Sequence, residues 1–360
     1  MNFLTLVALL GLCIGASAAD AVADAAAKFL AGLPVRGTAA EPLTRSAEWA
    51  QHATELDRAW AKVEELQLGK IRNWAPAYLG ASSTSHAAMF YMFSGPDFLY
   101  ANAFYPSANT YLLCGIEPVG AIPQLDNLPP AALASSLATL RKSLESSLNW
   151  SFFITKNMKV DLTATQLSGT LPVLYVFLAR AGCTIDSVEL VALNRDGAFV
   201  PPGKGAAAGV KIVFFGTSGR QQTLYYFSSD LSDSGLRANP GFLKLCERQA
   251  PGLTLLKAAS FLMHEEGFSK VRSFLLAHSS VILQDDSGIP YRFLADPAQW
   301  KVRFCGRYVG PIDLFKQHAQ PDLAHLFQSG IPVPLGFGFG YQWQPRSASL
   351  MIAVPKVSSP

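Results

Sequence analysis

Blocks of apolar residues separated by polar turns are clearest between residues 87 and 117. An apolar run over residues 87–93 leads through a turn into a short apolar-periodic segment over residues 98–105, and a second apolar run occupies residues 111–116. Strand, loop, helix and strand in this order form the unit from which parallel α/β sheets are built. We therefore expect a parallel βαβ unit at residues 87–117, with its two strands side by side.

From residue 185 the apolar positions alternate with a period of two, and turns rich in Gly, Asn and Asp separate the alternating segments. This pattern predicts an antiparallel meander over residues 185–229. Further along, the pattern predicts a helix at residues 253–263, a strand–turn–strand unit at residues 281–284 and 291–294, and a C-terminal hairpin of residues 335–343 and 349–354.

Stripes of apolar residues at helical spacing predict helices that flank this sheet. One stripe of tryptophans and aliphatic residues runs through residues 49–63, and a stripe of leucines runs through residues 133–148. The expected fold is therefore α/β, with α+β as the alternative, built on a mixed sheet. We expect a helical segment over residues 19–80 to pack on a single α/β domain over residues 81–360.

The start of the chain has the features of an export signal. Residues 1–18 carry no charged side chain, are nearly all apolar from Phe3 to Ile14, and end in the small-x-small cleavage pattern Ala16-Ser17-Ala18. The apolar core is shorter than the roughly 20 residues that span a bilayer. We expect a cleaved signal peptide and an extracytoplasmic mature protein, secreted or periplasmic, without a transmembrane segment.

The composition and charge of the chain argue against one class of binding partner, nucleic acids. Half of the residues are hydrophobic and 15% are charged, which is typical of a globular protein with a dense core. The net charge is +3, and no basic cluster is longer than Arg141-Lys142. Because nucleic-acid binding needs a concentrated basic surface, we expect no nucleic-acid partner. A protein partner cannot be named from these residues.

Four cysteines follow the expected signal, namely Cys114, Cys183, Cys246 and Cys305. In an oxidising compartment they permit two disulfides with three pairings, while burial in strands equally permits free thiols. No Cys-x-x-Cys occurs, so the sequence supports neither a thioredoxin-like site nor a cysteine-rich zinc site. We expect no metal and no cofactor.

Polar residues follow both strands of the expected βαβ unit. Ser94, Gly95 and Asp97 come after the first strand, and Glu117 comes after the second. Because open α/β sheets bind ligands beyond the carboxyl ends of their strands, these four residues are the candidate ligand-binding set. A different interpretation makes Ser94 and Asp97 a capping box of the following helix, because their spacing is Ser-x-x-Asp.

The unit resembles the first half of a Rossmann-type nucleotide site, in its methyltransferase variant, because an acid follows the second strand and Gly-x-Gly-x-x-Gly is absent. The resemblance implies that Glu117 would meet ribose hydroxyls. However, the Asp97 carboxylate at the helix N-terminus would repel a phosphate. An exported protein also meets little nucleotide, so we expect an uncharged or cationic ligand instead.

Three further residues are candidates for acid–base chemistry. His264 precedes two acids near an expected helix end, where a histidine exchanges protons near neutral pH. Asp285 and Asp286 form an acidic turn after a strand, although Asp and Gly are also what tight turns demand. The candidate catalytic set is therefore Glu117, His264, Asp285 and Asp286.

Together these patterns predict an exported α/β protein whose acidic cleft binds or acts on an uncharged or cationic small molecule or a glycan. The lack of an intact catalytic signature supports an alternative of a different class, a non-catalytic envelope or secreted interaction protein. The sequence does not separate an enzyme from a receptor.

Overall fold

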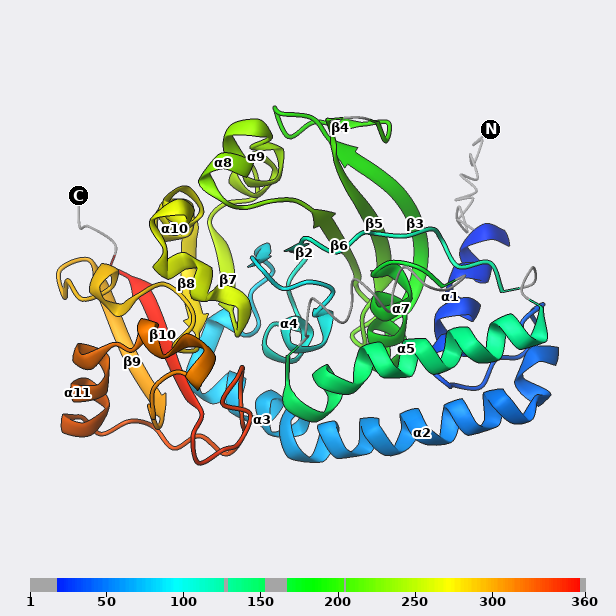
Figure 1. The fold of residues 1–360 in the computed structure, drawn as a ribbon, viewed down its shortest axis with the longest axis horizontal. Helices are drawn as coiled ribbons and strands as arrows, with labels where there is room; N and C mark the ends of the chain where they lie inside the picture. The colour runs from blue at the N-terminus through cyan, green and yellow to red at the C-terminus, as the bar shows by residue number, and fades with distance from the viewer. Residues whose placement is uncertain (1–17, 126–128, 153–166, 204, 357–360) are drawn as a thin grey trace, which may run out of the picture.

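The computed structural model describes residues 18–125, 129–152, 167–203 and 205–356 (Figure 1). Apart from Ala18, the expected signal peptide lies outside the described residues. In the described part of the chain, ten strands form one sheet in the order β4-β3-β5-β6-β2-β1-β7-β8-β10-β9. The strands are β1 (Met89–Tyr91), β2 (Thr110–Gly115), β3 (Thr184–Leu193), β4 (Phe199–Val200), β5 (Ala207–Phe215), β6 (Gln221–Ser228), β7 (Gly252–Leu256), β8 (Ser279–Gln284), β9 (Trp300–Gly306) and β10 (Ser349–Pro355).

The middle of the sheet is parallel and its two ends are antiparallel. β6, β2, β1, β7 and β8 run in one direction. β5, β3 and β4 continue the sheet antiparallel beyond β6, and β10 and β9 do so beyond β8. This arrangement confirms the mixed α/β sheet, the parallel unit at residues 87–117 and the meander at residues 185–229.

Helices cover both faces of the sheet (Figure 1). Neighbouring residues of a strand point to opposite faces, so Tyr91 of β1 enters one core and Phe90 enters the other. Helices α1 to α5 and α7 pack on the Tyr91 face, and α8, α9 and α10 pack on the Phe90 face. The helices are α1 (Ala18–Leu30), α2 (Ala47–Val63), α3 (Gly69–Leu79), α4 (Phe98–Phe104), α5 (Pro130–Trp150), α7 (Leu171–Arg180), α8 (Asp233–Ala238), α9 (Gly241–Glu247), α10 (Ser269–His278) and α11 (Pro321–Ser329).

The apolar stripes of α2 and α5 face this core as their spacing predicts. The five leucines of α5, from Leu133 to Leu148, are all buried, and so are Leu56 and Val63 of α2. The two helices run side by side along one side of the molecule (Figure 1). Burial of these two stripes in the shared core stabilises both helices, because isolated helices of this length are marginal in water.

The structure differs from the sequence prediction in three places. Residues 252–256 form strand β7 at the start of the segment predicted as a helix, and all five of its residues are buried. A strand covered by helices on both faces has a continuous apolar sequence, which periodicity does not distinguish from a buried helix. Tyr291–Phe293 is a 3₁₀ helix and not a strand. β10 pairs with β8 and β9 and not with residues 335–343, whose Phe337 and Phe339 rings fill the core instead.

Cys114, Cys183, Cys246 and Cys305 are all free and buried, so the alternative of free thiols is the one observed. Among the described helices, none combines the length and the apolar character needed to cross a membrane.

The centre of the sheet contains a topological switch point between β1 and β7. These strands are parallel neighbours, but β1 connects through α4 to β2 on one side, while β7 connects through α10 to β8 on the other. Parallel crossovers are right-handed, so two that move in opposite directions lie on opposite faces. A crevice therefore remains beyond the carboxyl ends of β1 and β7, where ligands bind in sheets of this type.

Candidate functional site

Two adjoining chambers lie at the switch point. The outer chamber has a volume of about 210 Å³ and the inner one about 20 Å³. The outer walls include five large apolar side chains and two carboxylates, from Phe93, Ile116, Leu231, Leu262, Phe268, Glu117 and Asp230. The inner walls include the polar residues Tyr91, Ser94, Asp97 and Lys257. Phe93, Gly95, Glu117 and Ala259 line both chambers, so the apolar outer chamber adjoins the polar residues of the inner one.

Glu117 is buried at the junction of the two chambers. Its Oε2 accepts hydrogen bonds from the Ile116 N–H at 3.1 Å and from the Tyr226 hydroxyl at 3.3 Å. Gly115 makes room for this conformation, because a Cβ there would lie 2.3 Å from Oε2. Within the described residues no group donates a hydrogen bond to Oε1, which leaves that oxygen for a ligand.

Ser94 and Gly95 join the end of β1 to the end of β2. The Ser94 hydroxyl donates to the Gly95 carbonyl at 2.8 Å and accepts from the Cys114 N–H at 3.3 Å. The predicted capping box is therefore wrong for Ser94, since backbone groups at the end of the ladder take up its hydroxyl. Asp97 is the N-cap of α4, and its Oδ1 accepts from the Tyr100 N–H at 3.3 Å.

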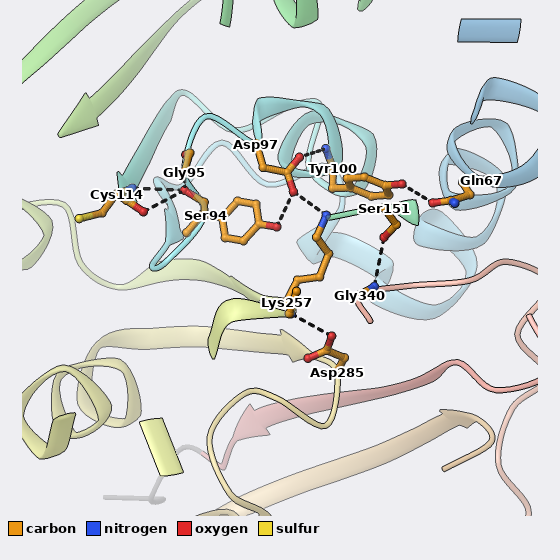
Figure 2. Close-up of polar contacts among 12 residues, drawn as sticks. Gln67, Ser94, Gly95, Asp97, Tyr100, Cys114, Ser151, Lys257, Asp285 and Gly340 are labelled. Carbon is orange, nitrogen blue, oxygen red and sulfur yellow. Dashed lines mark hydrogen bonds and ion pairs between the residues drawn. The ribbon is translucent and has the colours of Figure 1, made fainter. Parts of the chain in front are cut away.

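The polar centre of the inner chamber is an ion pair between Lys257 and Asp97 (Figure 2). Nζ of Lys257 lies 2.5 Å from Oδ2 of Asp97, and each side chain is 2% exposed. The Tyr91 hydroxyl donates to the same oxygen at 2.8 Å. The Asp97 carboxylate therefore binds three groups. Its Oδ2 binds the Lys257 ammonium and the Tyr91 hydroxyl, and its Oδ1 accepts from the Tyr100 N–H at the start of α4.

Aromatic rings surround the Lys257 ammonium group. Nζ lies 3.5 Å from the centroid of the Tyr100 ring and 5.6 Å from that of Phe339. The Tyr100 hydroxyl donates to Gln67, which the π-helical turn Glu64–Leu68 carries into the core (Figure 2). Burial lowers the pKa of Lys257, while Asp97 acts in the opposite direction. The π-helical turn that carries Gln67 is also relevant, because such turns often occur at functional sites.

Backbone strain occurs at both strand ends that meet in the crevice. Phe93 after β1 and Ala258 after β7 both have φ of 58°, in the region that favours glycine. Such residues cost about 1–3 kcal/mol each and cluster at active sites and ligand clamps. Both line the inner chamber, so the strain coincides with the chamber rather than with a remote turn.

The Asp285 carboxylate forms a hydrogen bond with the strained residue Ala258 at the end of β7. Its Oδ2 accepts from the Ala258 N–H at 3.1 Å (Figure 2). Its Oδ1 accepts from the Ser287 N–H at 3.0 Å. Burial raises the pKa of Asp285 to about 6. The next carboxyl, Asp286, is also buried, and its Oδ2 has no hydrogen-bond partner in the described chain. Burial and the neighbouring Asp285 raise the pKa of Asp286 to about 8.

His264 ends a 3₁₀ helix, Ala259–His264, that follows β7. Its ring lies 5.0 Å from that of His318, and burial together with His318 lowers the pKa of His264 to about 4. Neither His264 nor Asp286 lines the two chambers. In the described residues, no cluster of three or more His, Cys, Asp or Glu side chains is arranged to hold a metal ion.

The structure therefore gathers only part of the predicted set. Ser94, Gly95, Asp97 and Glu117 line the chambers, and Asp285 lies one hydrogen bond behind them. Lys257 and Tyr91 belong to the site but were not predicted from the sequence. In the sequence, Lys257 is a single lysine that follows the mostly apolar residues 252–256. Because residues 253–263 were predicted to form a helix, Lys257 was not recognised as a residue at the end of a strand.

Comparisons of the chain with protein-family models, with curated proteins and with solved structures give no match. Function is therefore inferred from the site itself, since a fold alone does not specify one.

Proposed function

We propose that this protein binds a small molecule that has an apolar body and a cationic or hydrogen-bond-donating head. The observation that carries the proposal is the outer chamber at the switch point, where five large apolar side chains surround Glu117. Ligand pockets are mostly apolar, with a few polar groups that fix the orientation of the ligand. The volume of about 210 Å³ lies below the roughly 300–1,000 Å³ of pockets for drug-sized molecules, which favours a smaller ligand.

The charges around the outer chamber favour a cation over an anion. Among the described residues that line it, the charged ones are Glu117 and Asp230, and both are acidic. Glu117 keeps Oε1 for a donor from the ligand, as its other oxygen is already bonded. A hydrogen bond to a charged group contributes about 1.5–3 kcal/mol, which corresponds to roughly tenfold to a hundredfold in affinity.

Three probes of the same shape test this preference, namely phenethylamine, 2-phenylethanol and phenylacetate. Thermal unfolding and calorimetry with the purified protein measure their binding. We expect the amine to bind most tightly, the alcohol more weakly and the carboxylate least. Glu117→Gln should reduce the advantage of the amine over the alcohol by about tenfold or more, because the charge opposite the ammonium group is removed.

Glu189→Gln is the matched control, since Glu189 is exposed on β3 and outside both chambers. It should leave the order of the three probes unchanged. Equal binding of the amine and the carboxylate would rule out the acidic site. Binding of none of the three would favour the alternative, a non-catalytic interaction protein.

A further inference from the structure

Lys257 is buried at a considerable energetic disadvantage. Removing two charges from water costs several kcal/mol per ion, and a buried pair is often no more stabilising than apolar residues of similar volume. The pair with Asp97 nevertheless occupies the centre of the sheet, with both side chains 2% exposed. Ala258, the residue after Lys257, adds backbone strain at the same point. Stability alone does not account for a lysine here.

The position of Lys257 connects it to the proposed ligand. Lys257 lines the inner chamber, which shares Phe93, Gly95, Glu117 and Ala259 with the outer one. The inner volume of about 20 Å³ exceeds the roughly 10–15 Å³ that a cavity needs in order to hold one water. It therefore has room for the polar tip of a ligand whose apolar body fills the outer chamber.

We propose that the Lys257 amine condenses with the carbonyl group of an aldehyde or ketone held in this pocket. The inference rests on the proposed function for the outer chamber alone, which holds the apolar body of the ligand. The carbonyl group enters the inner chamber and takes the place of the cationic or donating head on Glu117. Asp97 first takes a proton from the Lys257 ammonium group. The Nζ lone pair attacks the carbonyl carbon, and proton transfer gives a neutral carbinolamine. Asp97 then returns its proton to the departing hydroxyl, so a protonated imine and one water are the products, and the imine nitrogen again carries a positive charge beside the Asp97 carboxylate.

The residues around Nζ suit each part of this step. Asp97 lies 2.5 Å away and can take and return the proton, while the Tyr91 hydroxyl holds the same carboxylate oxygen at 2.8 Å. Removal from water favours the neutral amine, and lysines that act as nucleophiles are activated in this way. The Tyr100 ring beneath Nζ compensates in part for the lost hydration of the charged form.

Reductive trapping tests the proposal on the full-length protein. The folded protein is incubated with phenylacetaldehyde and sodium cyanoborohydride, digested, and mapped by mass spectrometry. Lys301, which is exposed on β9, is the internal control for ordinary lysine reactivity. Unfolded protein in urea, treated in the same way, gives the intrinsic ratio of labelling at the two positions.

We expect Lys257 to be labelled faster than Lys301 in the folded protein and at a similar rate in the unfolded protein. Each unit by which the pKa of Lys257 is lowered raises its neutral fraction about tenfold below that pKa. The preference should therefore be larger at pH 7 than at about pH 10.5, where an ordinary lysine is already about half neutral. Asp97→Asn should slow labelling at Lys257 and leave Lys301 unaffected.

Labelling of Lys257 no faster than Lys301 in the folded protein would overturn the inference. This comparison needs no variant, so it holds even if Asp97→Asn does not fold. If phenethylamine still binds in that case, the pocket remains and only the reactive lysine is lost. Labelling of Lys257 without any binding of the amine would instead support the lysine and refute the acidic preference.

Discussion

A buried ionisable side chain makes the free energy of unfolding depend on pH when its pKa differs between the folded and unfolded states. Asp286 is the clearest case, because its carboxyl is buried and Oδ2 has no partner among the described residues. Its pKa rises from an ordinary value of 3.8 to about 8 in the folded protein. The folded state therefore retains a proton that the unfolded chain has already released near neutral pH. This contribution to stability is complete below about pH 4 and is lost as the pH rises toward 8.

Asp286→Asn should remove this dependence. Between pH 6 and 8, one proton held only by the folded state makes stability fall by about 1.4 kcal/mol per pH unit. This window lies above the pKa of about 6 for Asp285, whose own contribution is then largely lost. Urea unfolding of both proteins at several pH values measures the slope.

Asp322→Asn is the control for Asp286→Asn, since Asp322 is an exposed acid in α11. It should follow the wild-type slope. An Asp286→Asn protein with an unchanged slope between pH 6 and 8 would show that Asp286 is ionised in the folded state.

At the scale of elements, apolar periodicity predicted the helices better than it predicted the strands. The leucine stripe of α5 places every leucine in the core, because a 3.6-residue period is long enough to recognise over 21 residues. β7 has only five residues and is buried on both faces, so its sequence carries no alternation. The helix predicted at residues 253–263 was wrong for residues 253–256, which belong to β7. Because β7 is one of the two strands at the switch point, the sequence did not predict the crevice between β1 and β7.

Leu144→Ala tests the α5 stripe. Leu144 is fully buried in the core where α5 packs against α2 and α7, so its truncation should destabilise the protein by about 2–5 kcal/mol through lost burial and a residual cavity. Glu145→Ala, on the exposed side of the same helix, should change stability by no more than about 0.5 kcal/mol. Chemical denaturation measures both, and equal losses would contradict the assignment of faces.

For the whole molecule, the sheet should be most stable at its parallel centre. β1, β2 and β7 are covered by helices on both faces, whereas β4 and β9 are the outer strands. Regions open locally with free energies that depend on such burial. We therefore expect the site to lie on the most stable part of the sheet, which would pre-organise the pocket. Export from the cytoplasm stays a prediction from residues 1–18.

Hydrogen exchange followed by mass spectrometry tests this order. Peptides that cover β1, β2 and β7 should exchange at least about tenfold more slowly than those of β4 and β9, which corresponds to about 1.4 kcal/mol in the free energy of opening. Faster exchange in β7 than in β9 would mean that the switch point is a mobile part of the fold.

The order of residues along the chain determined the local features of this protein. It specified the βαβ unit, the meander and the helical stripes, because each depends on the spacing of neighbouring residues. It also placed Glu117 and Asp97 at strand ends. Only the tertiary structure decided that Lys257 meets Asp97, 160 residues apart, and that His264 and Asp286 stay outside the chambers. The pairing of β1 with β7 joins two segments that are distant in the sequence, so no local pattern predicts that these two strands are neighbours.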